Sequence, residues 1–175
     1  TGGVNALGDE IVVAVLDDGF DLSHPDLNFW INEAEVANDG IDDDGNGYID
    51  DVKGWNASTE DDDIVSAQHG THVAGIVGAR GNNGIGITGV NWNVKIMAVQ
   101  VFNGSDLAES DILDGYNYIL SNRLLYDQSD GEFGAFIVAT NASFSKAGWQ
   151  PEDYTEWCEI FDALGTAGIL NVGTA

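Results

Sequence analysis

Short apolar runs, separated by stretches of helical pattern, constrain the fold of this chain more than any other feature. The run over 11–16 is unbroken and rich in β-branched residues, as in strands buried on both faces of a parallel sheet. Further runs of this kind cover 94–101, 135–139 and 168–172, and helical patterns cover 70–79, 110–122 and 152–164. Strands alternating with helices predict an α/β fold with a parallel central sheet. Reactive side chains would then lie beyond the carboxyl ends of the strands.

The net charge narrows the choice of partners. The 175 residues include 30 Asp and Glu against 5 Lys and Arg, which gives a formal net charge of -25. Such a chain is repelled by phosphates, so we expect no nucleic acid partner, and cations are favoured instead. We also expect no membrane span, since no apolar run reaches the roughly 20 residues that a bilayer requires.

The acidic residues are concentrated in one segment. Twelve of them lie between Asn28 and Asp63, where Lys53 is the single base. Within this segment the oxygen-bearing side chains alternate, and a glycine follows at the sixth position of the pattern, as in the first part of an EF-hand calcium loop. The twelfth position is Lys53 rather than Glu, so a complete EF-hand is not expected.

We therefore predict an acidic insertion at about 32–63 that folds around Ca²⁺ with its own ligand geometry. The alternative is a solvated acidic loop, the common fate of charge runs. In the calcium interpretation Tyr48 contributes its backbone carbonyl, and either of two final aspartates completes the coordination. The predicted ligands are Asp42, Asp44, Asn46, Tyr48, Asp50 and Asp51.

Two further motifs carry residues suited to catalysis. Asp17, Asp18 and Gly19 follow the first predicted strand directly, and His69 immediately precedes the first predicted helix. A histidine in this position is suited to general-base chemistry. Taken separately, each motif has a simpler interpretation: the aspartates satisfy a turn, and His69 caps a helix or pairs with His72 around a metal.

Together these motifs resemble the subtilisin-like serine proteases, the subtilases. The resemblance rests on V-A-V-L-D-D-G at 13–19, S-H-P-D-L at 23–27 and H-G-T-H-V-A-G-I at 69–76, in that order. The stretch N-N-G-I-G-I-T-G-V at 82–90 resembles the calcium loop of the family, and N-A-S at 141–143 resembles a strand that pairs with substrate. Asp-Asp-Gly replaces the commoner Asp-Thr/Ser-Gly and is also found in the kexin-like branch, but His72-Val73 follows the bacterial pattern. Specificity for basic residues is therefore not inferred from Asp18 alone.

The resemblance implies a role for each matching residue. Asp17 would orient His69, which would accept the proton of a serine hydroxyl. A second calcium site would use the side chains of Asp26 and Asn83 and the carbonyls of Ile85 and Ile87. The implied substrate-binding residues, on two strands flanking an extended peptide, are Gln100, Phe102, Gly104, Ser143 and Phe144.

The nucleophile motif of the family, G-T-S-M-A-x-P, is absent from the chain. We therefore expect residues 1–175 to be the N-terminal part of one catalytic domain, with a subtilisin-like three-layer fold that is incomplete at its C-terminal side. The chain alone would be inactive, and a C-terminal segment would supply the serine.

Expected partners of this endopeptidase are a protein or peptide substrate, that C-terminal segment, and a pro-segment acting as inhibitor or chaperone. The expected location is secreted, extracellular or at the cell surface. The alternative function is a catalytically inactive, calcium-dependent binding module that kept the fold and lost the nucleophile.

Overall fold

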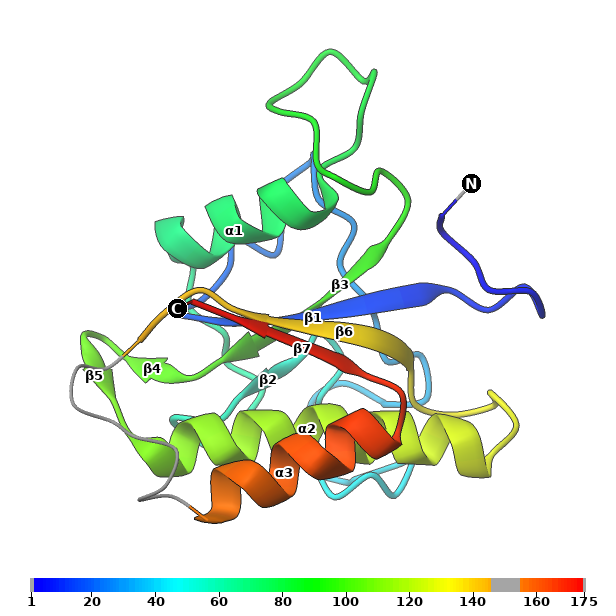
Figure 1. The fold of residues 1–175 in the computed structure, drawn as a ribbon, viewed down its shortest axis with the longest axis vertical. Coiled ribbons are helices and arrows are strands. Elements are labelled where there is room, and N and C mark those ends of the chain that lie inside the picture. The colour runs from blue at the N-terminus through cyan, green and yellow to red at the C-terminus, as the bar shows by residue number, and fades with distance from the viewer. Residues whose placement is uncertain (1, 146–154, 175) are drawn as a thin grey trace.

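The computed structural model describes residues 2–145 and 155–174 as an α/β fold built on a mostly parallel central sheet (Figure 1). The strands are β1 (Ile11–Asp17), β2 (Trp55–Asn56), β3 (Lys95–Gln100), β4 (Phe102–Asn103), β5 (Asp106–Leu107), β6 (Phe136–Ala142) and β7 (Leu170–Gly173). The helices are α1 (Gln68–Gly78), α2 (Glu109–Gln128) and α3 (Thr155–Thr166).

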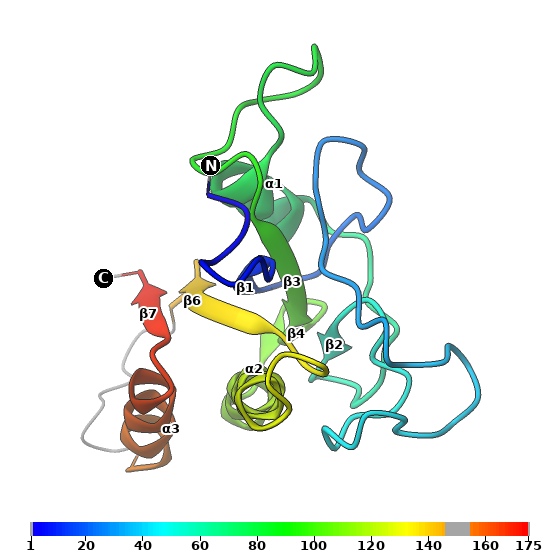
Figure 2. The ribbon, with the colours of Figure 1, turned by 90° about the vertical axis from the view of Figure 1, so that its right-hand side faces the viewer.

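The main sheet has the order β2-β3-β1-β6-β7, and all of its strand pairs are parallel. Helix α1 covers one face, while α2 and α3 cover the other, which gives three layers (Figures 1 and 2). The chain passes from β1 through α1 to β3, then through α2 to β6 on the other side of β1. The strand order therefore reverses at β1, and such a switch point is where open α/β sheets place their ligands.

Strand β1 owes its place at the centre to its apolar residues on both faces. Val12 and Leu16 belong to the core between the sheet and α2, whereas Val15 belongs to the core under α1. Each of these three side chains is at most 1% exposed. The unbroken apolar run thus contributes side chains to the hydrophobic cores on both faces of the sheet, as the sequence predicts.

The remaining sequence predictions differ from the structure mainly at element ends. Helix α2 continues to Gln128 rather than ending at Asn122, and the predicted start of α3 at Glu152 lies outside the described residues. Strands β2, β4 and β5 were not predicted, because two residues are too short to show a periodic pattern. The described helices include none that is long and apolar enough to cross a membrane.

The acidic insertion lies beside β2 and rests on α2 (Figure 2). Tyr48 packs edge-on against Trp55 and Tyr118, with ring centroids 4.9 Å apart in both pairs. Ser121 of α2 donates a hydrogen bond of 2.5 Å to the carbonyl of Asn46. These contacts join the insertion to the main core.

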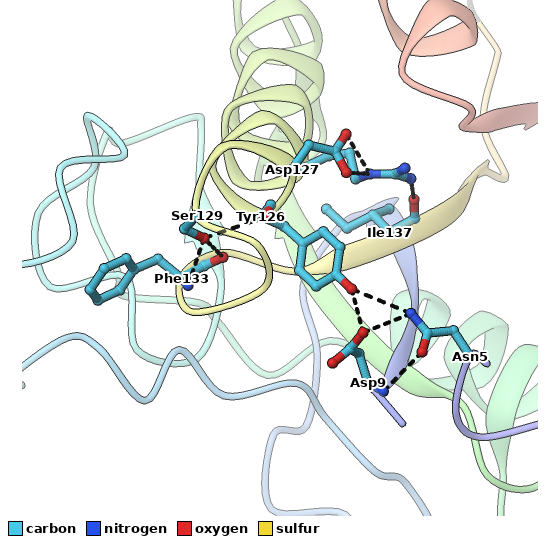
Figure 3. Close-up of polar contacts among 8 residues, drawn as sticks. Asn5, Asp9, Tyr126, Asp127, Ser129, Phe133 and Ile137 are labelled. Carbon is cyan, nitrogen blue, oxygen red and sulfur yellow. Dashed lines mark hydrogen bonds and ion pairs between the residues drawn. The ribbon is translucent and has the colours of Figure 1, made fainter. Parts of the chain in front are cut away.

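Helix α2 also fixes the chain before β1. The Tyr126 hydroxyl donates to the Asp9 carboxylate at 2.5 Å, and the Asn5 amide donates to the same oxygen at 2.8 Å (Figure 3). This cluster lies at the amino-terminal edge of the sheet, where β1 begins, so the chain enters β1 in a fixed position.

Candidate active site and metal-binding loops

Asp17 is the last residue of β1 and lies at the strand-order switch point. It is only 1% exposed, and one of its oxygens, Oδ1, accepts the backbone N–H of Asp18 at 2.8 Å. The other oxygen, Oδ2, is buried without a hydrogen-bond partner among the described residues. Burial raises the pKa of this carboxyl, and its hydrogen bond with His69 opposes that rise.

Two glycines bring the start of α1 against the end of β1. Gly19 has a φ of 130°, and a Cβ there would lie 2.3 Å from the carbonyl oxygen of Val65. A Cβ on Gly70 would lie 2.3 Å from the carbonyl oxygen of Gly19 and 2.9 Å from the Cβ of Asp17. The backbones therefore approach to a distance that a larger residue would prevent.

This close approach places His69 beside Asp17. Its ring nitrogen Nδ1 lies 2.6 Å from Oδ1 of Asp17, while 56% of the His69 side chain remains exposed. The hydrogen bond to Asp17 raises the pKa of His69, and partial burial opposes this rise. A buried carboxylate behind an exposed imidazole favours the tautomer whose free Nε2 can accept a proton.

The structure also bears on the alternative of a histidine metal pair. His72 and His24 line a pocket of ≈ 450 Å³, and His69 is not part of that lining. Among the described residues, His69 lies with Asp17 and Asp18 in a group whose ligand atoms are within 4.8 Å of one another, and His72 is not part of that group. The geometry therefore favours an Asp17–His69 pair.

Glu35 is the organising residue of the acidic insertion. It is 7% exposed, and its carboxylate accepts the backbone N–H groups of Asp43 at 2.8 Å, Asp44 at 3.1 Å and Asp50 at 3.1 Å. Oxygens of Glu35, Asp42 and Asp44 lie within 4.8 Å of one another. The sequence did not single out Glu35, because it lies upstream of the EF-hand-like spacing; its position in an acidic stretch was the available signal.

Asp51 and Asn46 extend this cluster inward, toward α2. Asp51 is fully buried and accepts the side-chain amides of Asn32 at 2.9 Å and Asn46 at 3.1 Å. Burial raises the pKa of Asp51 to about 6, and burial likewise raises the pKa of Asp44 and of Glu35. Neighbouring carboxylates that are partly or fully buried are costly as anions unless a cation neutralises them.

Three predicted ligands of the insertion, Asp42, Asp50 and Tyr48, also make hydrogen bonds or ring contacts within the protein. Asp50 has a φ of 59° and accepts the N–H groups of Asp39 at 3.0 Å and Gly40 at 3.1 Å, so its side chain closes a neighbouring turn. Asp42 accepts the N–H of Gly45 at 2.8 Å. Tyr48 places its ring in the aromatic cluster with Trp55 and Tyr118, and its N–H donates to Asn46.

The second predicted calcium loop closes around Asp26. This residue is 1% exposed, and its carboxylate accepts the Asn83 amide at 2.6 Å and the N–H of Ile87 at 3.2 Å. The N–H of Ile85 donates to Oδ1 of Asn83 at 3.1 Å. A Cβ on Gly86 would lie 2.3 Å from Oδ2 of Asp26, so the loop passes very close to the carboxylate. All four residues implied by the resemblance thus lie together.

The predicted substrate residues lie near the carboxyl ends of β3 and β6. The rings of Phe102 and Phe144 pack edge-on at 5.3 Å, which brings the end of β6 next to the β4–β5 hairpin. Gly104 forms the exposed turn of that hairpin with a φ of 62°. Ser143 accepts the side-chain amide of Asn141 at 2.9 Å.

Gln100 differs from the other predicted substrate residues, because its side chain is only 3% exposed and bonds within the protein. It accepts the N–H of Val65 at 2.9 Å and donates to the carbonyl of Phe102 at 2.9 Å. The side chain thus connects the segment before α1 to the hairpin.

The fold and site define a doubly wound α/β protein with an Asp–His pair at the switch point of its sheet. The Subtilase family profile matches residues 8–170. Subtilisin-like protease 1 of Plasmodium vivax is 36% identical over 136 residues, which cover 75% of this chain and 22% of that protein. The major intracellular serine protease of Bacillus subtilis is 38% identical over 120 residues, which cover 67% of this chain and 32% of that protein.

A solved Pseudoalteromonas arctica protease superposes with a TM-score of 0.60 and 28% identity, covering 93% of this chain and 48% of the other. The chain belongs to the subtilase family, which is a family of serine proteases. The chain spans less than a third of the length of the Plasmodium vivax protease and of the Bacillus subtilis protease.

Proposed function

We propose that this chain supplies the Asp–His part of a serine endopeptidase that hydrolyses peptide bonds. The serine would come from a C-terminal segment outside residues 1–175. The observation that carries the proposal is the 2.6 Å contact between Nδ1 of His69 and the buried Asp17 carboxylate at the sheet's switch point. Family membership supports the same reaction class.

In this mechanism Asp17 keeps the proton of His69 on Nδ1, which leaves Nε2 free to accept the proton of the serine hydroxyl. The serine oxygen then attacks the peptide carbonyl, and His69 returns the proton to the departing amine, which leaves an acyl-serine. A water molecule that gives a proton to His69 attacks this ester, and return of that proton to the serine oxygen releases the acid product and restores the serine. The Asp17 carboxylate stabilises the imidazolium that forms in between. The 56% exposure of the His69 side chain fits this role, since the ring must meet both serine and substrate.

Peptide hydrolysis by the full-length protein tests this proposal. We expect the wild type to cleave an unstructured protein substrate, and His69→Ala to lower kcat/KM by at least about 10³-fold. The exposed His72, three residues along the same helix, provides a matched control, and His72→Ala should retain activity. A folded wild type without hydrolysis would instead favour the inactive calcium-dependent binding module.

We also propose that the acidic insertion binds Ca²⁺ through Glu35, Asp42 and Asp44, with Asp51 and Asn46 completing the cluster from inside. The fit rests on the donor set, because hard carboxylate and amide oxygens are the ligands that Ca²⁺ prefers. Bound Ca²⁺ would neutralise carboxylates whose pKa values burial raises, and would thereby hold the insertion in its folded form.

Thermal denaturation with Ca²⁺ or with a chelator tests this site in the full-length protein. Calcium at a hundred times its Kd should stabilise the wild type by about 2.7 kcal/mol per site relative to chelator. Glu35→Gln should remove most of the calcium-dependent shift in Tm from the insertion, whereas the exposed Asp39→Asn should keep it. An identical shift in the wild type and Glu35→Gln would overturn the assignment.

The loop around Asp26 is proposed as the second Ca²⁺ site, with Asn83 as side-chain ligand and carbonyls of Ile85 and Ile87. The proximity of Asp26 to Asn83 and to the backbone at Ile87 supports it. An extended peptide substrate is proposed to pair with backbone near Phe102 and Gly104 on one side and near Ser143 and Phe144 on the other.

A pro-segment is the remaining proposed partner. We propose secretion or cell-surface display, because calcium sites of this kind fill readily at extracellular calcium concentrations. Detecting the protein in culture supernatant rather than in the cell lysate tests this location.

A further inference from the structure

Asp18, the residue after the buried Asp17, makes a direct contact with the helix that carries His69. Its carboxylate oxygen Oδ1 accepts the backbone N–H of Gly70 at 2.9 Å. Gly70 is the third residue of α1, so this N–H is one of the donors at a helix start that have no partner within the helix. Asp18 therefore acts as an N-terminal cap that comes from outside the helix.

The helix has no cap of its own. Its N-cap residue is Ala67, which makes no side-chain capping bond, and its first turn contains no acidic residue. Nearby, Thr71 receives the N–H of Asp21 at 2.8 Å and donates to the carbonyl of Ala67 at 2.5 Å. Asp18 is thus the carboxylate that fixes the start of α1 to the turn after β1.

The same carboxylate lies beside the catalytic pair. Oxygens of Asp17 and Asp18 and a ring nitrogen of His69 lie within 4.8 Å of one another. Asp17 uses its Oδ1 for His69, whereas Asp18 uses its Oδ1 for the neighbouring backbone. The negative charge of Asp18 nevertheless favours the protonated imidazole and, with Asp17, raises the pKa of His69.

We propose that Asp18 is a positioning residue for His69, which holds the first turn of α1 against β1 and adds a second negative charge beside the imidazole. This inference rests on the proposed function, because it assigns a further role within the same site. The two contributions are separable by substitution. Asn keeps an oxygen that can accept the Gly70 N–H but removes the charge, and Ala removes both.

The test measures kcat/KM against pH for the full-length protein. Asp18→Ala should lower kcat/KM by about 10- to 100-fold, the cost expected when a catalytic group moves by up to an ångström. Asp18→Asn should recover most of that loss at high pH, because the cap remains. Its acid limb should move to lower pH, since the imidazole loses one of its two neighbouring charges.

Asp21→Asn is the matched control. It removes one negative charge from the same turn and keeps the oxygen that accepts the Ser23 N–H at 3.1 Å. Its contact with α1 is made through the backbone N–H of Asp21, which the substitution retains. Both kcat/KM and the acid limb should therefore match the wild type.

Wild-type kcat/KM in Asp18→Ala, or an unmoved acid limb in Asp18→Asn, would overturn the inference. If Asp18→Ala fails to fold, as judged by circular dichroism, the acid limb of Asp18→Asn decides alone. A wild-type protein without hydrolysis would mean the failure of the proposed function, whereas an active wild type matched by both variants would mean the failure of this inference alone.

Discussion

Replacing Gly70 with Ala should separate His69 from Asp17 while leaving both residues chemically unchanged. The new Cβ would lie 2.3 Å from the carbonyl oxygen of Gly19 and 2.9 Å from the Cβ of Asp17, and an ordinary contact begins at 3.4 Å. The new Cβ and the carbonyl oxygen of Gly19 are both attached directly to the backbone, so neither can rotate away. The start of α1 must therefore move by about 1 Å to relieve the overlap. A shift of this size, taken along the 2.6 Å contact between His69 and Asp17, would break that hydrogen bond.

We expect Gly70→Ala to lower kcat/KM of the full-length protein by about 100-fold, the effect of misplacing a catalytic group by 1 Å. The free energy of unfolding should fall by about 1–3 kcal/mol from overpacking. Steady-state peptide hydrolysis and thermal denaturation measure the two effects.

Gly75→Ala is the matched control, because it lies in the same helix and its Cβ would meet Ile87 at 3.5 Å, an ordinary contact. Alanine should stabilise this helix position by about 0.5–1 kcal/mol and leave kcat/KM unchanged. Wild-type kcat/KM in Gly70→Ala would refute the idea that the glycine contact positions the pair.

Three further predictions concern charge and internal hydrogen bonds. Asp17→Asn should lower the pKa of His69, since its main cause of elevation is lost, and an NMR titration of the imidazole should show the shift to lower pH. Burial raises the pKa of Asp51 to about 6 in the folded protein, whereas the unfolded chain releases this proton near pH 3.8. With chelator present, the free energy of unfolding should therefore fall by about 3 kcal/mol as the pH rises from about 3.8 to about 6. Excess Ca²⁺ should abolish this fall, and urea unfolding at several pH values measures both. Gln100→Leu should leave the N–H of Val65 without its acceptor and the carbonyl of Phe102 without its donor, and should lower stability by about 1–3 kcal/mol in thermal denaturation.

The sequence predicts the central sheet and the pairing of Asp17 with His69 because both leave local patterns. Strand β1 is an unbroken apolar run, and its two buried faces follow from that run alone. Asp17 and His69 lie 52 positions apart, and the motif resemblance indicates their partnership. The structure adds the physical reason for it, which is the close backbone contact of Gly19 with Gly70.

The acidic insertion was less accessible to sequence reasoning, because side-chain directions in an irregular loop follow backbone angles and distant contacts. The positive φ of Asp50 turns its carboxylate toward 39–40, while the adjacent Asp51 is buried. Glu35 gains its role by accepting three N–H groups from residues up to 15 positions away. No spacing rule contains such contacts.

Gln100 illustrates the same limit within a strand. Its position beside the predicted substrate-binding segment suggests contact with a ligand, yet its amide joins Val65 to Phe102 inside the protein. The neighbours of a strand end depend on which loops pack over it, and these are set by the whole fold rather than by the local sequence.

The most direct test of the catalytic assignment is the labelling of the full-length protein with a fluorophosphonate, followed by mass spectrometry of the modified peptide. Such a reagent modifies a serine whose hydroxyl is activated by a neighbouring base. We expect one modified serine outside residues 1–175, and loss of labelling in His69→Ala. Labelling that persists at the wild-type rate in folded His69→Ala, or no labelling of the folded wild type, would contradict the assignment.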